Sequence, residues 1–443
     1  MFRQSRFALL ILCAVLMLLP PTAFAESALR RIDQHKHLGV ASCASGVCHG
    51  SNKPFKDSTV MRNEFALWQQ FDPHATKAMQ ALSSAEGQSI ARKLGLGDAA
   101  QAKVCLDCHA DNIAVAQRGE KFQADDGIGC ETCHGGAEKW IASHADRKVS
   151  HADNLAAGLY PTEDPVARAE LCLSCHMGTP ERMITHRIMG AGHPRLAFEL
   201  DTFTWLNPHY TIDADYEKRK GRFNGLRDWG VGQGVAASNA LDVLLDERHG
   251  SQGIFPELVL FDCHACHRPM SGKRWAPRQG TGLGPGVVRL NDSNLVMYRH
   301  VLAVVDSAAS NRLRSEVRAL HQATTLSRDA TADAARKLRD EIRGSLPGVG
   351  AHAFGADSLG PILDSMMRDA EAGEFRDYAA AEQASMAVQS VMVAFQNAGA
   401  MDADKAKALQ ARVDGLYATV ERDEAYDMSR FVSALRQVRA AAR

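Results

Sequence analysis

The stretch Gly127–Gly136 reads GIGCETCHGG, and its pattern organises the whole sequence. Two cysteines stand three positions apart and the second is followed at once by histidine. Three other stretches repeat this C-x-x-C-H order, and one more carries C-x4-C-H. The five cysteine pairs are Cys43 and Cys48, Cys105 and Cys108, Cys130 and Cys133, Cys172 and Cys175, and Cys263 and Cys266. The histidines that follow them are His49, His109, His134, His176 and His267.

This order is the attachment signature of c-type haem. The two thiols bind the haem vinyl groups as thioethers, and the next residue lies under the ring as the proximal iron ligand. A disulfide framework would explain none of the five histidines. A zinc ribbon does not need histidine beside the second cysteine every time, and a redox dithiol occurs once rather than five times. The sequence therefore predicts five covalently bound haem c groups.

The first motif is unusual because its spacer has four residues. For both thiols to reach the vinyl groups, the two extra residues must loop out. The alternative is a single thioether through Cys48, with Cys43 free. We favour two bonds, since an unattached thiol in an exported protein would be reactive.

The N-terminus indicates export. Arg3 and Arg6 precede an apolar run of 13 residues, Phe7–Leu19, and a small-x-small site ends at Ala25. This is typical of a signal peptide over residues 1–25, cleaved after Ala25, and it predicts a periplasmic protein. The run is short for a membrane-spanning helix. Removal of the peptide takes away Cys13, so the odd count of 11 cysteines becomes the five pairs.

Composition excludes some functions and suggests a kind of partner. The chain has 443 residues, 45% of them hydrophobic, and a formal charge of −1, which argues against disorder and against a basic nucleic-acid-binding protein. Five haems with two propionates each would add about ten negative charges at pH 7. We therefore expect redox proteins as electron donor and acceptor, and expect them to be basic.

Residues 40–180 resemble the tetrahaem cytochrome c-554 family, the electron acceptor in bacterial ammonia oxidation. The features that carry the resemblance are the early motif, Trp68 and His74 before Met79, the stretch Gly127–Gly136, and His144 ten residues after His134. The resemblance covers about a third of the chain. It implies a haem-based helical domain in which His144 is the distal ligand to the haem of His49, and His74 to that of His134.

The remaining distal positions are less determined. The chain departs from the family in its longer first spacer, slightly different early spacings, a fifth motif and a long tail. For the haem of His176 we favour His193, with His186 second; alternatively the two serve the fourth and fifth haems. The haem of His109 is five-coordinate in the resembling family, which leaves one iron face open. Here His37 could cover it, and His35, His151 and His209 are weaker candidates.

Other histidines and the methionines are expected to have different roles. We interpret His264 as a spacer within its own motif. His300, His321 and His352 are expected to be surface or core residues of the tail helices, and most of the 15 methionines core fillers. Only Met177, Met189 and Met270 have settings that suit an iron ligand.

The expected fold class is mainly α with long irregular loops. Residues 26–276 would form a pentahaem domain whose core is largely the macrocycles, residues 277–289 a Gly/Pro-rich linker, and residues 290–443 a C-terminal α-helical bundle. In the tail, helical patterns cover 291–322, 330–345, 402–421 and 424–442. An apolar stripe with helical spacing adds a further helix there: Ala384, Val388, Val391, Met392 and Phe395.

Two functions remain open at this stage. The first is electron transfer through a chain of mostly bis-histidine haems, which have no open coordination position. The second is an oxidoreductase that acts on a small nitrogen or sulfur compound at one haem with an open face, for which the haem of His109 is the candidate. Association as a homodimer through the C-terminal helices and a peripheral contact with a membrane are further expectations.

Overall fold

The computed structural model describes residues 28–54, 58–206, 209–221, 223–251, 256–267, 278–397 and 402–442. The expected signal peptide, Met270 and the first residue of the Gly/Pro-rich stretch lie outside these ranges. Within them the chain is mainly helical and has no strand, only two isolated bridges. This confirms the expected mainly-α fold with long irregular connections.

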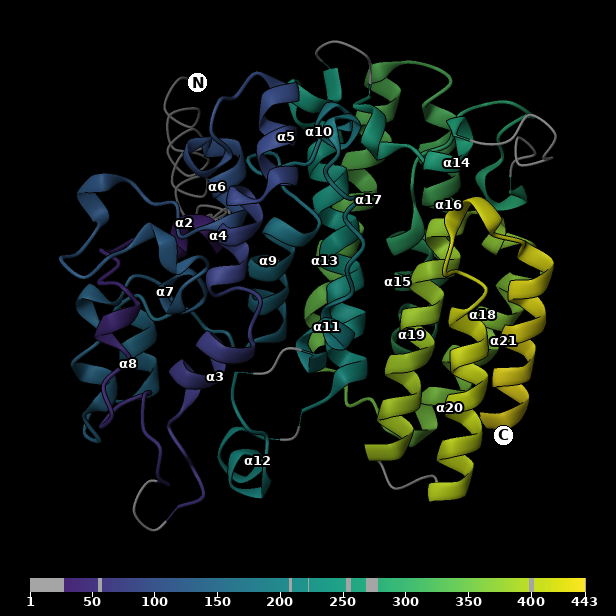
Figure 1. Ribbon diagram of the computed structural model, residues 1–443. Coiled ribbons are helices and arrows are strands. Elements are labelled where there is room, and N and C mark those ends of the chain that lie inside the picture. Colours follow the sequence, from purple (N-terminus) through teal and green to yellow (C-terminus); the bar gives the residue numbers. More distant parts are fainter. Residues whose placement is uncertain are drawn as a thin grey trace, which may run out of the picture.

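The N-terminal half consists of short helices joined by long loops, drawn in purple to teal in Figure 1. Most span between one and three turns, and several coincide with cysteine motifs. Its α-helices are α2 (Ala28–Ile32), α3 (Glu64–Phe71), α4 (Thr76–Ser83), α5 (Ala85–Leu94), α6 (Lys103–His109), α7 (Cys130–His134), α8 (His151–Ala156), α9 (Pro165–His176), α10 (His186–Ala191), α11 (Leu200–Leu206) and α12 (Ala214–Lys220).

The C-terminal half is a bundle of longer helices, teal to yellow in Figure 1. It begins with a helix that precedes the fifth motif, since α13 packs against α15, α17 and α19. The bundle thus includes a segment from before the Gly/Pro-rich stretch. The helices are α13 (Gly225–Leu245), α14 (Cys263–Cys266), α15 (Ser293–Val305), α16 (Ser307–Ala323), α17 (Arg328–Ala351), α18 (Ala356–Glu371), α19 (Tyr378–Asn397), α20 (Ala403–Tyr417) and α21 (Met428–Ala442).

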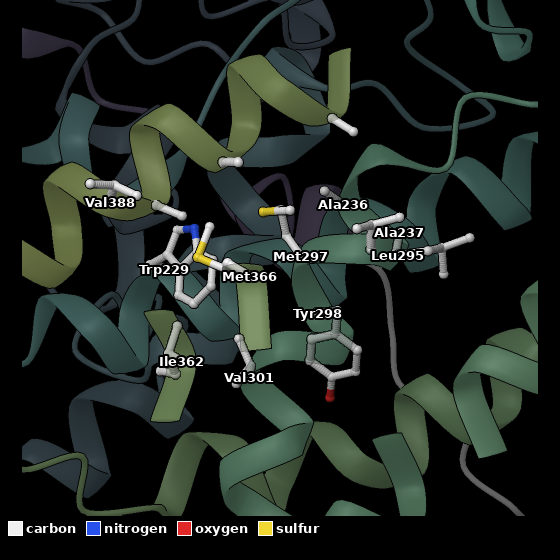
Figure 2. Close-up of a cluster of buried hydrophobic side chains, with 14 of the residues drawn as sticks. Trp229, Ala236, Ala237, Leu295, Met297, Tyr298, Val301, Ile362, Met366 and Val388 are labelled. Atoms are coloured by element: carbon white, nitrogen blue, oxygen red, sulfur yellow. The ribbon is translucent and has the colours of Figure 1, made fainter. Parts of the chain in front are cut away.

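The bundle has one continuous apolar core. Trp229 of α13, Met297 of α15 and Met366 of α18 are fully buried and lie together in it (Figure 2). The stripe expected from the sequence is confirmed on α19: its first four members are buried in this core, and Phe395 packs against it. Helices α9 and α11 pack into this core, with Leu173 and Leu200 buried in it, but the rest of the N-terminal half has only small, separate clusters of buried apolar side chains.

Two expected helix boundaries were wrong. The pattern over 291–322 is divided at Asp306, whose carboxylate accepts hydrogen bonds from the first turn of α16 and so begins a new helix. The second pattern was expected to end near Pro347, but α17 continues through it to Ala351. Leu346 and Val349 on either side are buried, and their packing offsets the hydrogen bond that proline cannot make.

The Gly/Pro-rich stretch is tied to the bundle by buried charges. The Arg278 side chain, 1% exposed, bonds Asp292 and Asp377, and Arg289, 2% exposed, bonds Asp377 and Asp262. Asp262 immediately precedes the fifth motif. Burial opposes the charge of Arg278, but the surrounding carboxylates raise its pKa above the ordinary value. This network fixes the start of α14 against the bundle helices.

No helix in the described ranges is both long enough and apolar enough to cross a membrane.

Candidate haem-binding site

The cysteine motifs lie on short helices or turns that present their reactive groups together. Four motifs lie in α6, α7, α14 and the last turn of α9, and the first follows a short 3-10 turn. In a helix, residues three and four positions apart share a face, so both thiols and the histidine of a C-x-x-C-H motif point the same way. None of the ten cysteines in the described ranges is paired in a disulfide bond.

The spacing of histidine rings is the main geometrical test of whether these motifs fit haem. An imidazole nitrogen binds a transition metal at about 2.0–2.1 Å, so two imidazoles on opposite sides of one metal have ring centroids about 6.3 Å apart. Four of the five motif histidines have another histidine near that distance. The pairs are His49 with His144 at 6.2 Å, His74 with His176 at 5.7 Å, His109 with His193 at 6.5 Å, and His186 with His267 at 6.0 Å.

The nitrogens of these rings are also suitably arranged. In five of the eight rings, Nδ1 is hydrogen-bonded to a carboxylate or a backbone carbonyl, which leaves Nε2 for a metal. In the His74–His176 pair the two Nε2 atoms face each other at 3.5 Å. The five bonds run from His49 to Glu64, His74 to Asp72, His109 to the Ala78 carbonyl, His144 to the Ile141 carbonyl and His193 to the Pro194 carbonyl. These donor sets fit an iron with two axial histidines.

The pairing of His49 with His144 agrees with the expected one. The two rings are nearly parallel, with 10° between their planes. His144 lies in a short 3-10 turn, and the edge of its ring meets Trp140 at 5.3 Å. Trp140 is buried, so the ring of His144 is supported on one side by a fixed aromatic surface.

The position of His74 differs from the expectation. Its ring lies against His176 of the fourth motif rather than His134 of the third. The reason is local: Asp72 accepts hydrogen bonds from both the backbone N–H and Nδ1 of His74, which fixes the ring at the turn between α3 and α4. Burial opposes the charge of His74, but Asp72 raises its pKa.

His193 also has a different partner from the favoured one. It faces His109 of the second motif, while His186 faces His267 of the fifth. The expectation that the two histidines serve different motifs agrees with this geometry, but the fourth motif is not one of them. The open iron face anticipated at His109 therefore has a histidine opposite it.

His37, the residue expected to cover that face, has another role. Its side chain is completely buried, Nδ1 lies 2.7 Å from an oxygen of Asp111, and Nε2 lies 3.2 Å from the Ile32 carbonyl. Burial opposes its charge, but Asp111 raises its pKa. Since both ring nitrogens are occupied, His37 ties the N-terminal segment to the loop after the second motif.

The third motif histidine has a different environment. His134 is partly buried, and desolvation lowers its pKa to about 4; among its charged neighbours His209 has the largest further lowering effect. His209 lies 3.7 Å from Asp72, the carboxylate that holds His74. His209, a weak candidate from the sequence, is thus in the neighbourhood of the third motif.

Thiols of different motifs meet in space. Cys43 of the first motif and Cys130 of the third are close enough to influence each other's pKa, as are Cys175 of the fourth and Cys108 of the second. Arg182 donates to the sulfur of Cys175 at 3.2 Å. Cys172, also of the fourth motif, is close enough to influence the pKa of Cys133 of the third.

Sequence reasoning missed Glu131, which lies between the cysteines of the third motif. It is 2% exposed and accepts hydrogen bonds of 2.7 Å from the backbone N–H groups of Leu38, Gly39 and Ala137. The carboxylate thereby fixes the loop before the first motif and the loop after the third. A charged residue enclosed between two attachment cysteines was the available signal.

The remaining histidines have other contacts. His300 and His321 are buried in the bundle, which is one of the two roles expected for them, surface or core, and His321 bonds Asp292 at 3.0 Å. His264 is buried against Tyr378, and His151 is exposed and bonded to Glu163. No group of three or more metal-binding side chains forms a separate site in the described residues.

Residues 42–135 match the family model for cytochrome c554 and c-prime. This match supports a c-type cytochrome, a class of electron-transfer protein with covalently bound haem c, and a multihaem family. It includes the first three cysteine motifs. No curated protein and no solved structure matches the chain.

Proposed function

We propose that this chain is an exported pentahaem c-type cytochrome that carries electrons between redox partners. The observation that carries the proposal is the set of four histidine pairs with ring centroids 5.7–6.5 Å apart, each containing one motif histidine. Haem c, when bound, supplies an iron that exchanges single electrons. Two axial histidines leave that iron no open position for bond chemistry.

The protein's own residues hold and tune the ligands. Carboxylates of Glu64 and Asp72 accept hydrogen bonds from Nδ1 of His49 and His74, which orients each ring and makes it a stronger electron donor. Backbone carbonyls do the same for His109, His144 and His193.

Contacts between motifs support an order for the electron path. The Cys43–Cys130 contact joins the first motif to the third, Cys133 is close to Cys172 of the fourth, and Cys175 meets Cys108 of the second. These contacts support the order first, third, fourth, second. Neighbouring centres of this kind favour transfer along a chain rather than storage at isolated sites.

The oxidoreductase alternative is not favoured at the second haem. It requires an open iron face at His109, and His193 lies opposite that residue with the ring spacing of a ligand pair. The expected periplasmic location, the basic partners and a homodimer through the C-terminal helices are part of the proposal. They rest on the sequence, namely the N-terminal signal and the acidic charge that haem propionates would add.

A haem count combined with ligand binding tests the function. Purified mature protein should give five haems per chain by pyridine haemochrome, and the reduced form should not bind carbon monoxide. Binding of one carbon monoxide per chain would favour the oxidoreductase. Fewer than five haems would refute the count itself.

A further inference from the structure

The helix α10 is short, yet it has one candidate distal ligand at its first residue and another just after its end. His186 begins the helix and faces His267 of the fifth motif, while His193 follows Gly192 and faces His109 of the second. At 1.5 Å rise per residue, the seven positions between them correspond to about 10 Å along the axis. One element thus connects two sites that belong to motifs more than 150 residues apart in sequence.

The N-terminal end of α10 is hydrogen-bonded to the segment that leads into the fifth motif. The backbone N–H of His186 donates to Oε1 of Glu257 at 2.9 Å, and Glu257 stands six residues before Cys263. The Thr185 side chain caps the same turn by accepting from Ile188. Glu257 therefore fixes the distal histidine relative to the motif that supplies the proximal one.

The other end is attached to the surroundings of the second motif. Nζ of Lys93 on α5 donates to the Ala191 carbonyl at 3.0 Å, and Gly192 ends the helix with φ 125°, a conformation that favours glycine. Figure 1 shows α5 and α10 side by side, and they pack together. Ala91 of α5 is buried in a cluster with Ala110 that also contacts Cys105 of the second motif.

We propose that α10 is a rigid bridge that holds the distal ligands of two haems at once, with Glu257 and Lys93 as its positioning residues. This inference rests on the proposed function, because it assigns ligands to the second and fifth haems. The inference extends the proposed function because it identifies α10 as the element that connects the fifth haem site to the other four. A displacement of α10 changes the ligation of both irons together.

Breaking the helix without touching either ligand tests the bridge. The N–H of Met189 donates to the Thr185 carbonyl at 3.0 Å, and proline at this position removes that bond and disrupts the turn. Met189 is not assigned as a ligand, because His109 and His267 each face a histidine. In Met189→Pro we expect two of five haems to change from low spin to high spin, while Met189→Ala, which keeps the helix but removes the thioether, leaves all five low spin. Conversion of only one haem, or of none, would overturn the bridge.

The ligand assignments are tested separately, which distinguishes failure of the bridge from failure of the proposed function. His186→Ala and His193→Ala should each convert one haem, and different ones. If neither does, both the ligand assignments and the bridge are wrong. If each converts one while Met189→Pro does not convert both, only the bridge is wrong.

A milder pair of variants keeps the test valid if Met189→Pro does not mature. Glu257→Ala removes the acceptor for His186, whereas Glu257→Gln removes the charge but keeps an oxygen to accept the bond. In a potentiometric titration we expect Glu257→Ala to shift the midpoints of two haems relative to Glu257→Gln. Lys93→Met should shift the same two, with Lys77→Met, an exposed lysine on α4, as control. Shifts confined to one haem, or to other haems, would contradict the proposal.

Discussion

The two halves of this molecule are stabilised in different ways. The bundle buries a continuous core of apolar side chains from helices up to 24 residues long. Apart from α9 and α11, which pack into that core, the N-terminal half has only small separate clusters, and its longest helix has 12 residues. The bundle is an ordinary case of hydrophobic stabilisation. The N-terminal half is organised around its cysteine motifs and histidine pairs, so we infer that its order depends on attached haem.

The largest effect is expected when haem attachment is prevented, which tests directly whether the two halves are stabilised in different ways. Chain produced without haem attachment should lose structure in the N-terminal half, because the small clusters there bury too little apolar surface to offset conformational entropy. The bundle, with its own core, should stay folded. Limited proteolysis followed by mass spectrometry should show rapid cleavage between residues 28 and 160 and a protected fragment that contains α15–α21. Equal protection of both halves would contradict the comparison.

Within the bundle, we expect the buried ion pairs of Arg278 to contribute more to the free energy of unfolding than exposed ion pairs do. Arg278→Met leaves Asp292 and Asp377 buried with reduced compensation, and breaking a buried ion pair costs about 3–5 kcal/mol. Urea unfolding followed by circular dichroism should show this loss for the bundle transition. Arg336→Met, which removes an exposed pair with Asp333 on α17, is the control and should cost less than about 1 kcal/mol. If Arg278→Met lowered the free energy of unfolding by no more than Arg336→Met does, the buried network would contribute little to stability.

The pH dependence of the bundle should depend on Glu199. Burial and the neighbouring Asp201 raise its pKa to about 7. A carboxyl with a raised folded-state pKa contributes stability that is complete below its ordinary pKa of 4.5 and is lost as pH rises through about 7. The loss should be on the order of 2–3 kcal/mol between pH 5 and 8.

Thermal unfolding of wild type and Glu199→Gln at the two pH values measures this effect. The wild type should be less stable at pH 8, and the variant should have a smaller difference. Glu371→Gln, an exposed residue of α18, should behave as wild type. An unchanged slope in Glu199→Gln would exclude this residue as its cause.

The smallest expected effect is a change in the reduction potential of one haem in the N-terminal half. Glu64 accepts a hydrogen bond from His49 at 3.1 Å. Glu64→Gln removes a negative charge beside the ligand, so the reduction potential of one haem should rise slightly while bundle stability stays unchanged. Glu86→Gln, an exposed residue of α5, is the control. A lower potential in Glu64→Gln would contradict the proposed ligand role of His49.

The sequence was sufficient for the features that depend on local pattern. Motif spacing located five cysteine pairs with their adjacent histidines, which the structure places on short helices or turns, and the apolar stripe identified α19. The His49–His144 pair was also anticipated, because it came with a specific resemblance around Gly127–Gly136. These features require only residues close in sequence or a motif with a known partner.

The features that the sequence did not predict depend on contacts between segments that are far apart in sequence. The partner of His74 is set by the turn that Asp72 fixes and by where α9 passes, and neither is visible in local spacing. His37 resembled a free ligand because its partner Asp111 is 74 residues away. Likewise, the burial of Arg278 could not be predicted from a stretch rich in glycine and proline, since its carboxylate partners lie on later segments.

The central claim is that facing histidines are axial ligand pairs, and His144→Ala tests it most directly. Electron paramagnetic resonance of the purified protein should show one of five haems changing from low spin to high spin, with all five still attached. His151→Ala, seven residues later and exposed, should leave the spectrum unchanged. A spectrum of His144→Ala identical to wild type would contradict the claim.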